Sequence, residues 1–144
     1  MKKEICFDMD GTIADLYGVE GWLEDLEHFS PRPYEMARPI MRMSQLARKL
    51  NQLPRKGYTI KVISWLSKAN NKAYDELVTE AKLAWLDTYL HSVQFDEIVI
   101  LPYGTPKSWF GDGILFDDEE RNRKEWNGFA YETSEIIEVL NSLL

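Results

Sequence analysis

Residues 4–12 read EICFDMDGT, and the fold prediction starts from this stretch. The apolar run over residues 5–7 predicts a short buried β-strand. Two aspartates, Asp8 and Asp10, follow at its carboxyl end, and the Gly-Thr pair at residues 11–12 is typical of a turn that stops a strand. The chain therefore places two acidic side chains where its first strand ends.

The rest of the chain alternates predicted helices with predicted strands. Runs rich in β-branched and other apolar residues predict strands at residues 58–64, 97–101, 113–117 and 128–131. Apolar residues at helical spacing predict helices at residues 19–28, 38–53 and 68–91, and a final helix capped by Ser134. This alternation predicts an α/β fold, a Rossmann-like parallel sheet flanked by helices that binds ligands at the carboxyl ends of its strands.

The length and composition predict one domain over residues 1–144. A chain of 144 residues with 44% hydrophobic content can build one core. Residues 15–38 form an excursion between the first two strands, and the prolines at 31 and 33 interrupt its helix because both cannot lie inside one.

Charge and cysteine content limit the classes of function. The formal net charge of -7 disfavours polymeric nucleic acid as a ligand, because a polyanion is repelled on average. The single cysteine, Cys6, cannot form an internal disulfide, which fits a reducing compartment. No apolar stretch is long enough for a signal peptide or a membrane span, so we expect a soluble cytoplasmic protein.

Polar side chains fall at four places that lie at or just beyond predicted strand ends. They are Asp8 with Asp10, Ser64, Lys107, and Asp117 with Asp118. Because the ends of parallel strands share one edge of the sheet, we expect these groups to lie close together. Such a set of carboxylates, a hydroxyl and an ammonium suits a divalent cation and a phosphate.

In these residues the sequence resembles the haloacid dehalogenase (HAD) superfamily. That family has a strand ending in Asp-x-Asp-x-Thr, then a strand-end Ser or Thr, then a Lys, then an acidic pair, and all four elements occur here in that order. The likeness extends from Ile5 to about Asp118, and its first element is the specific one. It implies a HAD-like phosphatase with a very small helical cap at about residues 15–38.

The resemblance also implies roles for the two aspartates of the first element. Asp8 is then the nucleophile that forms an aspartyl-phosphate. Asp10 is the general acid for the leaving group and then the general base for water, while its backbone carbonyl helps to hold the metal. An acid at residue 10 favours phosphate esters over dehalogenation.

The remaining elements complete the expected site. Gly11 and Thr12 would offer free backbone N–H groups to the phosphate, and Ser64 and Lys107 would contact the transferring group. Mg²⁺ is expected on Asp8, Asp10, Asp117 and Asp118, with Asp118 favoured as the direct ligand of the acidic pair. Thr105 and Lys68 are the nearest competitors for the hydroxyl and ammonium roles.

The short cap leaves an open site, which suits either a macromolecular phosphate end or a small phosphate ester enclosed by a second subunit of a homo-oligomer. The net negative charge favours the small molecule over a polynucleotide end. The side chains of Trp22, Arg32, Tyr34 and Trp65 are the expected substrate contacts, because flat side chains could stack on a base and arginine could meet phosphate. The chain also resembles small deoxyribonucleotidase-type members, which favours nucleoside monophosphates. These aromatic residues could equally pack the cap on the core.

Two alternatives stay open at this stage. One is a phosphatase for sugar phosphates or other small phosphometabolites. The other is a non-catalytic phosphate-dependent signalling module, because receiver domains combine similar residues. In receiver domains, however, the acidic pair comes first in the chain, whereas here it comes last.

Overall fold

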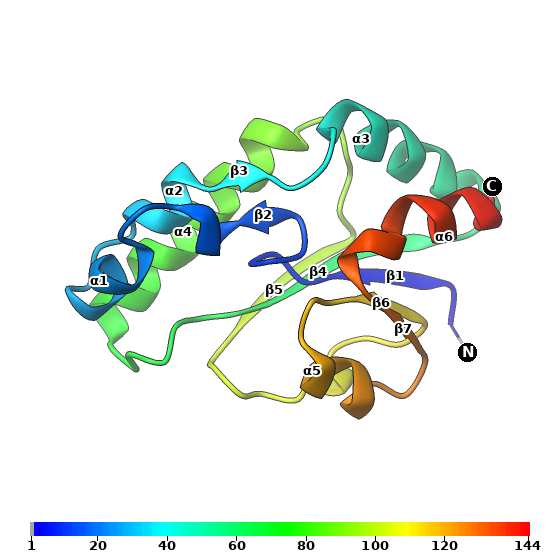
Figure 1. The fold of residues 1–144 in the computed structure, drawn as a ribbon. Coiled ribbons are helices and arrows are strands. Elements are labelled where there is room, and N and C mark those ends of the chain that lie inside the picture. Colours follow the sequence, from blue (N-terminus) through cyan, green and yellow to red (C-terminus); the bar gives the residue numbers. More distant parts are fainter. Residues whose placement is uncertain (1) are drawn as a thin grey trace.

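The computed structural model describes residues 2–144, and its centre is a five-stranded parallel sheet (Figure 1). The order of the strands across the sheet is β5-β4-β1-β6-β7. Their bounds are β1 Glu4–Phe7, β4 Thr59–Trp65, β5 Glu97–Leu101, β6 Ile114–Phe116 and β7 Phe129–Tyr131. Each strand pairs in parallel with its neighbours. The α/β class and the predicted parallel sheet are confirmed.

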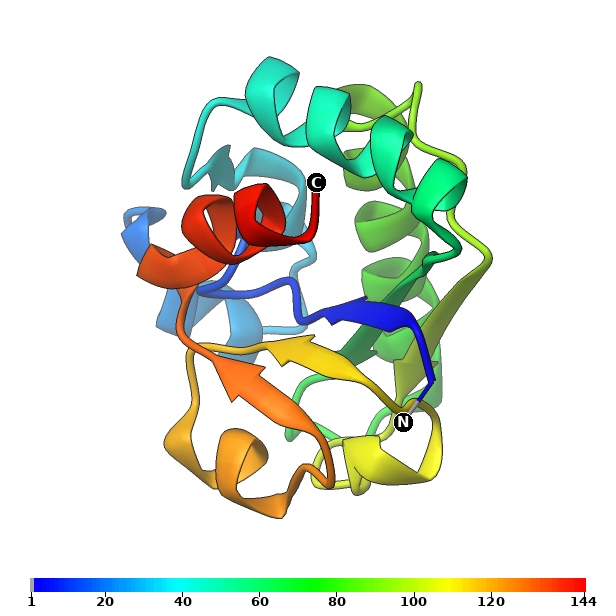
Figure 2. The same ribbon diagram turned by 90° about the vertical axis from the view of Figure 1, so that its right-hand side faces the viewer.

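Helices cover both faces of this sheet. Figure 2 shows α3 (Met43–Gln52) and α6 (Ile136–Leu143) on one face and α5 (Glu120–Glu125) on the other. The long helix α4 (Lys72–Tyr89) packs in the same core as α3 and α6. Alternate strand residues supply the two cores: Ile5 and Phe7 face α3, α4 and α6, whereas Cys6 belongs to the smaller core around Trp126.

The strand order makes a topological switch point between β1 and β6. From β1 the chain passes through α3 to β4 on one side, and from β6 it passes through α5 to β7 on the other. These two connections lie on opposite faces of the sheet (Figure 2). In open α/β sheets a crevice forms outside the carboxyl ends of two such strands, and ligands bind there. The residues that follow β1 and β6 are Asp8 and Asp117.

The predicted helices have different boundaries in the structure. Those expected at residues 19–28 and 68–91 are shorter and span Trp22–Glu27 and Lys72–Tyr89. The helix expected from residue 38 begins at Met43, because residues 38–39 form a short strand, β3 (Arg38–Pro39), that pairs with β2 (Ala14–Asp15). The last helix is not capped by Ser134. Instead Glu132 and Glu135 form a capping box at the 3₁₀ turn that leads into α6.

The cap comprises α1 (Trp22–Glu27) and α2 (Arg32–Met36), preceded by a 3₁₀ turn at Leu16–Gly18. The prolines that separate its helices also begin α2, because proline is tolerated in a first helical turn. The hydroxyl of Tyr74 donates to the Ser30 carbonyl at 2.9 Å, and the indole of Trp85 donates to the Ala37 carbonyl at 2.8 Å. Helix α4 thereby holds the cap at the edge where the strands end (Figure 1).

None of the helices formed by residues 2–144 has both the length and the apolar character needed to cross a bilayer.

Candidate active site

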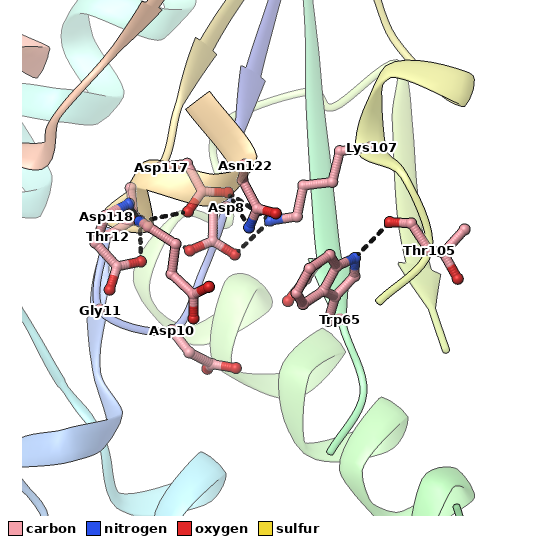
Figure 3. A network of polar contacts seen from close by, with 12 residues as sticks. Asp8, Asp10, Gly11, Thr12, Trp65, Thr105, Lys107, Asp117, Asp118 and Asn122 are labelled. Atoms are coloured by element: carbon pink, nitrogen blue, oxygen red, sulfur yellow. Dashed lines mark hydrogen bonds and ion pairs between the residues drawn. The ribbon is translucent and has the colours of Figure 1, made fainter. Parts of the chain in front are cut away.

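The switch point brings the first and last predicted elements together. Phe7 of β1 is in register with Phe116 of β6, and the Asp8 amide donates to the Phe116 carbonyl at 3.0 Å. Asp8 and Asp117 therefore leave neighbouring strands side by side, and both are buried. Figure 3 shows their carboxylates facing the ammonium of Lys107.

Lys107 joins these two carboxylates. It lies on the 3₁₀ turn at Lys107–Trp109 after β5, and its side chain is only 1% exposed. Its Nζ is 2.8 Å from Oδ1 of Asp8 and 2.7 Å from Oδ2 of Asp117. Burial opposes the charge on Lys107 and on Asp8. The carboxylates of Asp8 and Asp117 nevertheless raise the pKa of Lys107, and the positive charge of Lys107 holds the pKa of Asp8 below its ordinary value.

Asp117 is held by further donors. The side-chain amide of Asn122 donates to its Oδ2 at 3.1 Å, and the backbone N–H of Glu119 donates to its Oδ1 at 2.9 Å. Burial and the negative charge of Asp8 raise the pKa of Asp117 to about 6 despite these contacts. Asn122 was not identified from the sequence, where it lies inside a charged run that resembles a solvated helix.

Thr12 connects the first element with the last. Its buried hydroxyl lies 2.9 Å from Oδ2 of Asp8 and 3.2 Å from Oδ1 of Asp118, and it accepts the Asp118 amide at 3.1 Å. Gly11 has φ 81°, and a Cβ there would collide with the Asp118 carboxylate. Desolvation and the charge of Asp8 raise the pKa of Asp118 to about 8, although part of its side chain is open to solvent.

The three carboxylates are suited to a hard cation. Asp8, Asp117 and Asp118 each offer an oxygen, and these oxygens lie within 4.8 Å of one another. Oδ2 of Asp118 accepts no hydrogen bond from residues 2–144, whereas Oδ1 of Asp117 accepts one and its Oδ2 accepts two. A cluster of carboxylate oxygens matches the ligands that Mg²⁺ takes, and the bonding pattern leaves Asp118 the more available of the pair.

Asp10 has a partner that the sequence did not reveal. The ammonium of Lys82, on α4, is 2.8 Å from Oδ2 of Asp10, and it also donates to Ser64 Oγ at 2.6 Å and to the Trp65 carbonyl at 2.8 Å. Burial raises the pKa of Asp10, and the charge of Lys82 partly offsets this rise. Ser64 is fully buried and does not line the pocket described below.

The expected free amides of residues 11 and 12 are engaged in the turn. The Gly11 N–H donates to the Ala14 carbonyl at 2.8 Å, and the Thr12 N–H donates to the Met9 carbonyl at 3.1 Å. The turn closes on itself and uses both donors. By contrast, the amides of Met9 and Asp10 donate to no acceptor among residues 2–144. These two are therefore the better candidates for contact with phosphate oxygens.

A pocket of about 570 Å³ opens beside the carboxylates. Its wall from the cap is largely apolar and aromatic, with one acidic residue, and it consists of Leu16, Tyr17, Trp22, Leu23, Leu26, Glu27, Phe29 and Tyr34. Trp65 lines it from the end of β4, and Lys68 and Tyr103 line it from the loops after β4 and β5. Asp8, Asp10, Lys107, Asp117 and Asp118 also line it.

Not every expected substrate contact reaches this pocket. Arg32 does not line it, because its guanidinium pairs with Asp25 at 2.8 Å within the cap. Thr105, the competitor of Ser64 for the hydroxyl role, does not line the pocket either. Its hydroxyl donates to the Pro102 carbonyl at 2.7 Å, while its own carbonyl accepts the Trp65 indole N–H. Trp22 does line the pocket and packs edge-on against Tyr17, with ring centroids 5.0 Å apart.

The arrangement thus places a buried carboxylate, a second carboxyl group two residues away, a buried ammonium and a cluster of carboxylates that could hold a cation around one pocket. These are the components of phosphoryl transfer to a side chain. A scan against models of known protein families found no match, and a search of curated proteins found no matching protein either.

Proposed function

We propose that this chain is a Mg²⁺-dependent phosphatase that transfers a phosphoryl group to Asp8, with nucleoside monophosphates as its preferred substrates. The observation that carries this proposal is the contact of the Lys107 ammonium with both Asp8 and Asp117, at 2.8 and 2.7 Å, beside a pocket. This contact keeps Asp8 ionised and places a positive charge where a phosphate would meet the nucleophile. The resemblance to the HAD superfamily supports the same assignment.

The first half-reaction uses Asp8 and Asp10. A carboxylate oxygen of Asp8 forms a bond to phosphorus while the bond between phosphorus and the ester oxygen breaks. The departing oxygen takes the proton of the Asp10 carboxyl group, so the alcohol leaves neutral. Lys107 and the amides of Met9 and Asp10 stabilise negative charge on the phosphoryl oxygens.

The second half-reaction returns the enzyme to its starting state. Asp10, now ionised, accepts a proton from a water molecule whose oxygen forms a new bond to phosphorus. The bond between phosphorus and Asp8 breaks, and inorganic phosphate leaves. One residue thus serves as acid and then as base.

Asp8, Asp118 and the backbone carbonyl of Asp10 would hold Mg²⁺, and Asp117 would act directly or through water. The three clustered carboxylates fit this ion, because they supply the hard oxygen ligands that it requires. When bound, the ion supplies positive charge that offsets the repulsion between the Asp8 carboxylate and the phosphate oxygens.

The cap wall supports a nucleotide over a smaller phosphate ester. Tyr17, Trp22, Phe29 and Tyr34 supply aromatic surface within the same pocket as Asp8. A base gains stabilisation by stacking on such side chains, whereas a sugar phosphate leaves the apolar wall without a partner. Sugar phosphates are the second candidate, because the aromatic residues also pack against each other and against α4.

Phosphate release from a panel of nucleoside monophosphates and sugar phosphates tests the proposal. The wild-type protein should release phosphate with Mg²⁺ and not with EDTA, and Asp8→Asn should abolish release. Asp87→Asn, an exposed site on α4, makes the same change away from the pocket and should leave the rate unchanged. Equal rates for Asp8→Asn and the wild type would overturn the proposal. Stable labelling by a phosphodonor without turnover would favour the signalling module instead.

A further inference from the structure

Two cations lie on the aromatic side chains at the rim of the pocket. The guanidinium carbon of Arg121 is 4.9 Å from the ring centroid of Trp65 and 5.7 Å from that of Tyr103. The Lys68 ammonium is 5.1 Å from the Tyr103 ring, and the two rings are 4.9 Å apart. Stacking of this kind orders long cationic side chains that would otherwise be mobile on a surface.

Neither cation is neutralised by a carboxylate. No acidic oxygen of residues 2–144 lies within ion-pair distance of Lys68 or Arg121, although Glu27 and Glu119 line the same pocket. The chain has a net charge of -7, so acidic partners are abundant. Lys68 lines the pocket, whereas Arg121 does not line it but lies on the Trp65 and Tyr103 rings that do. The two unpaired cations therefore form a local positive site beside the pocket in an acidic protein.

One indole ring links these cations to the reacting centre. The Trp65 ring is 5.5 Å from the ammonium of Lys107, which contacts Asp8. Figure 3 shows Trp65 next to the Asp8 and Lys107 pair, with Thr105 beyond it. The Trp65 indole N–H donates to the Thr105 carbonyl at 2.8 Å, which fixes the ring. An anion on Lys68 and Arg121 would therefore belong to the same small molecule as a phosphate at Asp8.

We propose that Lys68 and Arg121 bind a second phosphate group of the substrate, so that the preferred substrate is a nucleoside bisphosphate. This inference rests on the proposed function for the position of the first phosphate. The faces of Trp65 and Tyr103 are directed at cations, which leaves the cap aromatics as the surface for the base. The pocket then has separate places for the base, the reacting phosphate and the second phosphate.

Binding to the Asp8→Asn variant tests this inference independently of hydrolysis. We would titrate this protein with Mg²⁺ present by calorimetry, using adenosine 3′,5′-bisphosphate and adenosine 5′-monophosphate. Two surface charge contacts should lower the Kd for the bisphosphate by about tenfold relative to the monophosphate. Added salt should reduce this ratio, because it screens exposed charges.

Further variants locate the effect. In the Asp8→Asn background, Lys68→Met with Arg121→Met should bring the Kd ratio close to one. Arg55→Met removes an exposed cation from the 3₁₀ turn at Leu53–Lys56, before β4, and should leave the ratio unchanged. Two results would overturn the inference. One is an unchanged Kd ratio in the variant with Lys68→Met and Arg121→Met. The other is equal Kd values for the bisphosphate and the monophosphate in Asp8→Asn itself.

A second pair of ligands identifies the source of the second phosphate. Fructose 1,6-bisphosphate and fructose 6-phosphate differ by one phosphate without a base. The protein could prefer the bisphosphate only in this pair and lose that preference when Lys68 and Arg121 are replaced by methionine. That result would overturn a nucleotide as the substrate and would support the second-phosphate site. If the wild type hydrolyses no ester yet the binding ratio depends on the two cations, the proposed function fails and the anion site stands.

Discussion

The ammonium of Lys82 lies 2.8 Å from Oδ2 of Asp10, and its side chain is 1% exposed. Its other two contacts go to Ser64 and to the Trp65 carbonyl, so three hydrogen bonds converge on one buried cation. The Tyr34 ring of the cap lies 5.2 Å from the same ammonium. Lys82 therefore connects Asp10, the end of β4 and the cap.

Lys82→Met should destabilise the protein strongly. Removing one partner of a buried ion pair leaves an uncompensated charge on Asp10, which costs about 3–5 kcal/mol. Lys72→Met, an exposed change in the first turn of the same helix, should shift the free energy of unfolding by less than about 0.5 kcal/mol. Urea unfolding measures both values. Equal stability of the two variants would contradict a structural role for the Lys82 and Asp10 pair.

The double variant Lys82→Met with Asp10→Asn separates stability from catalysis. It should recover much of the lost stability, because no unpaired carboxylate remains. Its hydrolysis of an alkyl phosphate should fall about 100-fold or more, since general acid catalysis contributes at least this much. Release of p-nitrophenol from p-nitrophenyl phosphate in a single turnover, which needs no proton on the leaving group, should fall much less than release of the alcohol from the alkyl phosphate. Equal losses in these single-turnover rates would exclude Asp10 as the acid.

Mg²⁺ should stabilise the folded protein. Binding of an ion to the three clustered carboxylates adds about 2.7 kcal/mol when its concentration is about 100 times the Kd. Thermal unfolding with and without Mg²⁺ measures this gain as a rise in Tm. The rise should be lost in Asp118→Asn and kept in Asp87→Asn. A full rise in Asp118→Asn would place the ion elsewhere.

Without a divalent cation, stability should fall as the pH rises from about 4 to about 8. Burial and the charge of Asp8 raise the pKa of Asp117 to about 6 and that of Asp118 to about 8. The folded state therefore keeps protons that the unfolded chain has already released, and each proton lost on raising the pH favours unfolding.

Urea unfolding in EDTA at pH 5 and pH 8 checks this prediction. Asp118→Asn removes the group with the higher pKa, so the difference in stability between the two pH values should be smaller in this variant. The same difference in the wild type and in Asp118→Asn would show that Asp118 does not carry the effect.

Trp22→Ala should raise the KM for a nucleoside monophosphate by about tenfold, because a stacked base is stabilised by roughly 1–3 kcal/mol. Its effect on p-nitrophenyl phosphate should be smaller, since the leaving group reaches less of the cap. Trp109, which is 73% exposed and does not line the pocket, supplies the matched Trp109→Ala control. A Trp22→Ala variant with an unchanged nucleotide KM would place the base elsewhere.

The sequence predicted the sheet and its polar edge well, because both depend on local patterns. The strand before Asp8 and the strand before Asp117 are short apolar runs that end in turn-forming or acidic residues. Their parallel order then brings the two aspartates together without further information. The beginning of α3 was predicted less well, since the pairing of Arg38 with Asp15 is a contact between distant residues.

Lys82 was missed because a lysine in a helix is normally solvated. A signal was present: Lys82 falls on the same face of α4 as the buried residues Tyr74, Val78 and Trp85, which are eight, four and three residues away, respectively. A cation among these positions indicates a buried partner. The sequence does not reveal which partner, since Asp10 is 72 residues away and meets Lys82 only through the fold.

The proposed mechanism depends on an aspartyl-phosphate at Asp8, and chemical trapping detects this intermediate directly. Wild-type protein turning over a nucleoside monophosphate with Mg²⁺ would be quenched in acid, reduced with borohydride and analysed by peptide mass spectrometry. We expect homoserine at position 8, formed by reduction of the acyl phosphate, and none in Asp8→Asn. Continued phosphate release by Asp8→Asn at the wild-type rate, with no modified residue at position 8 in either protein, would contradict the proposed mechanism.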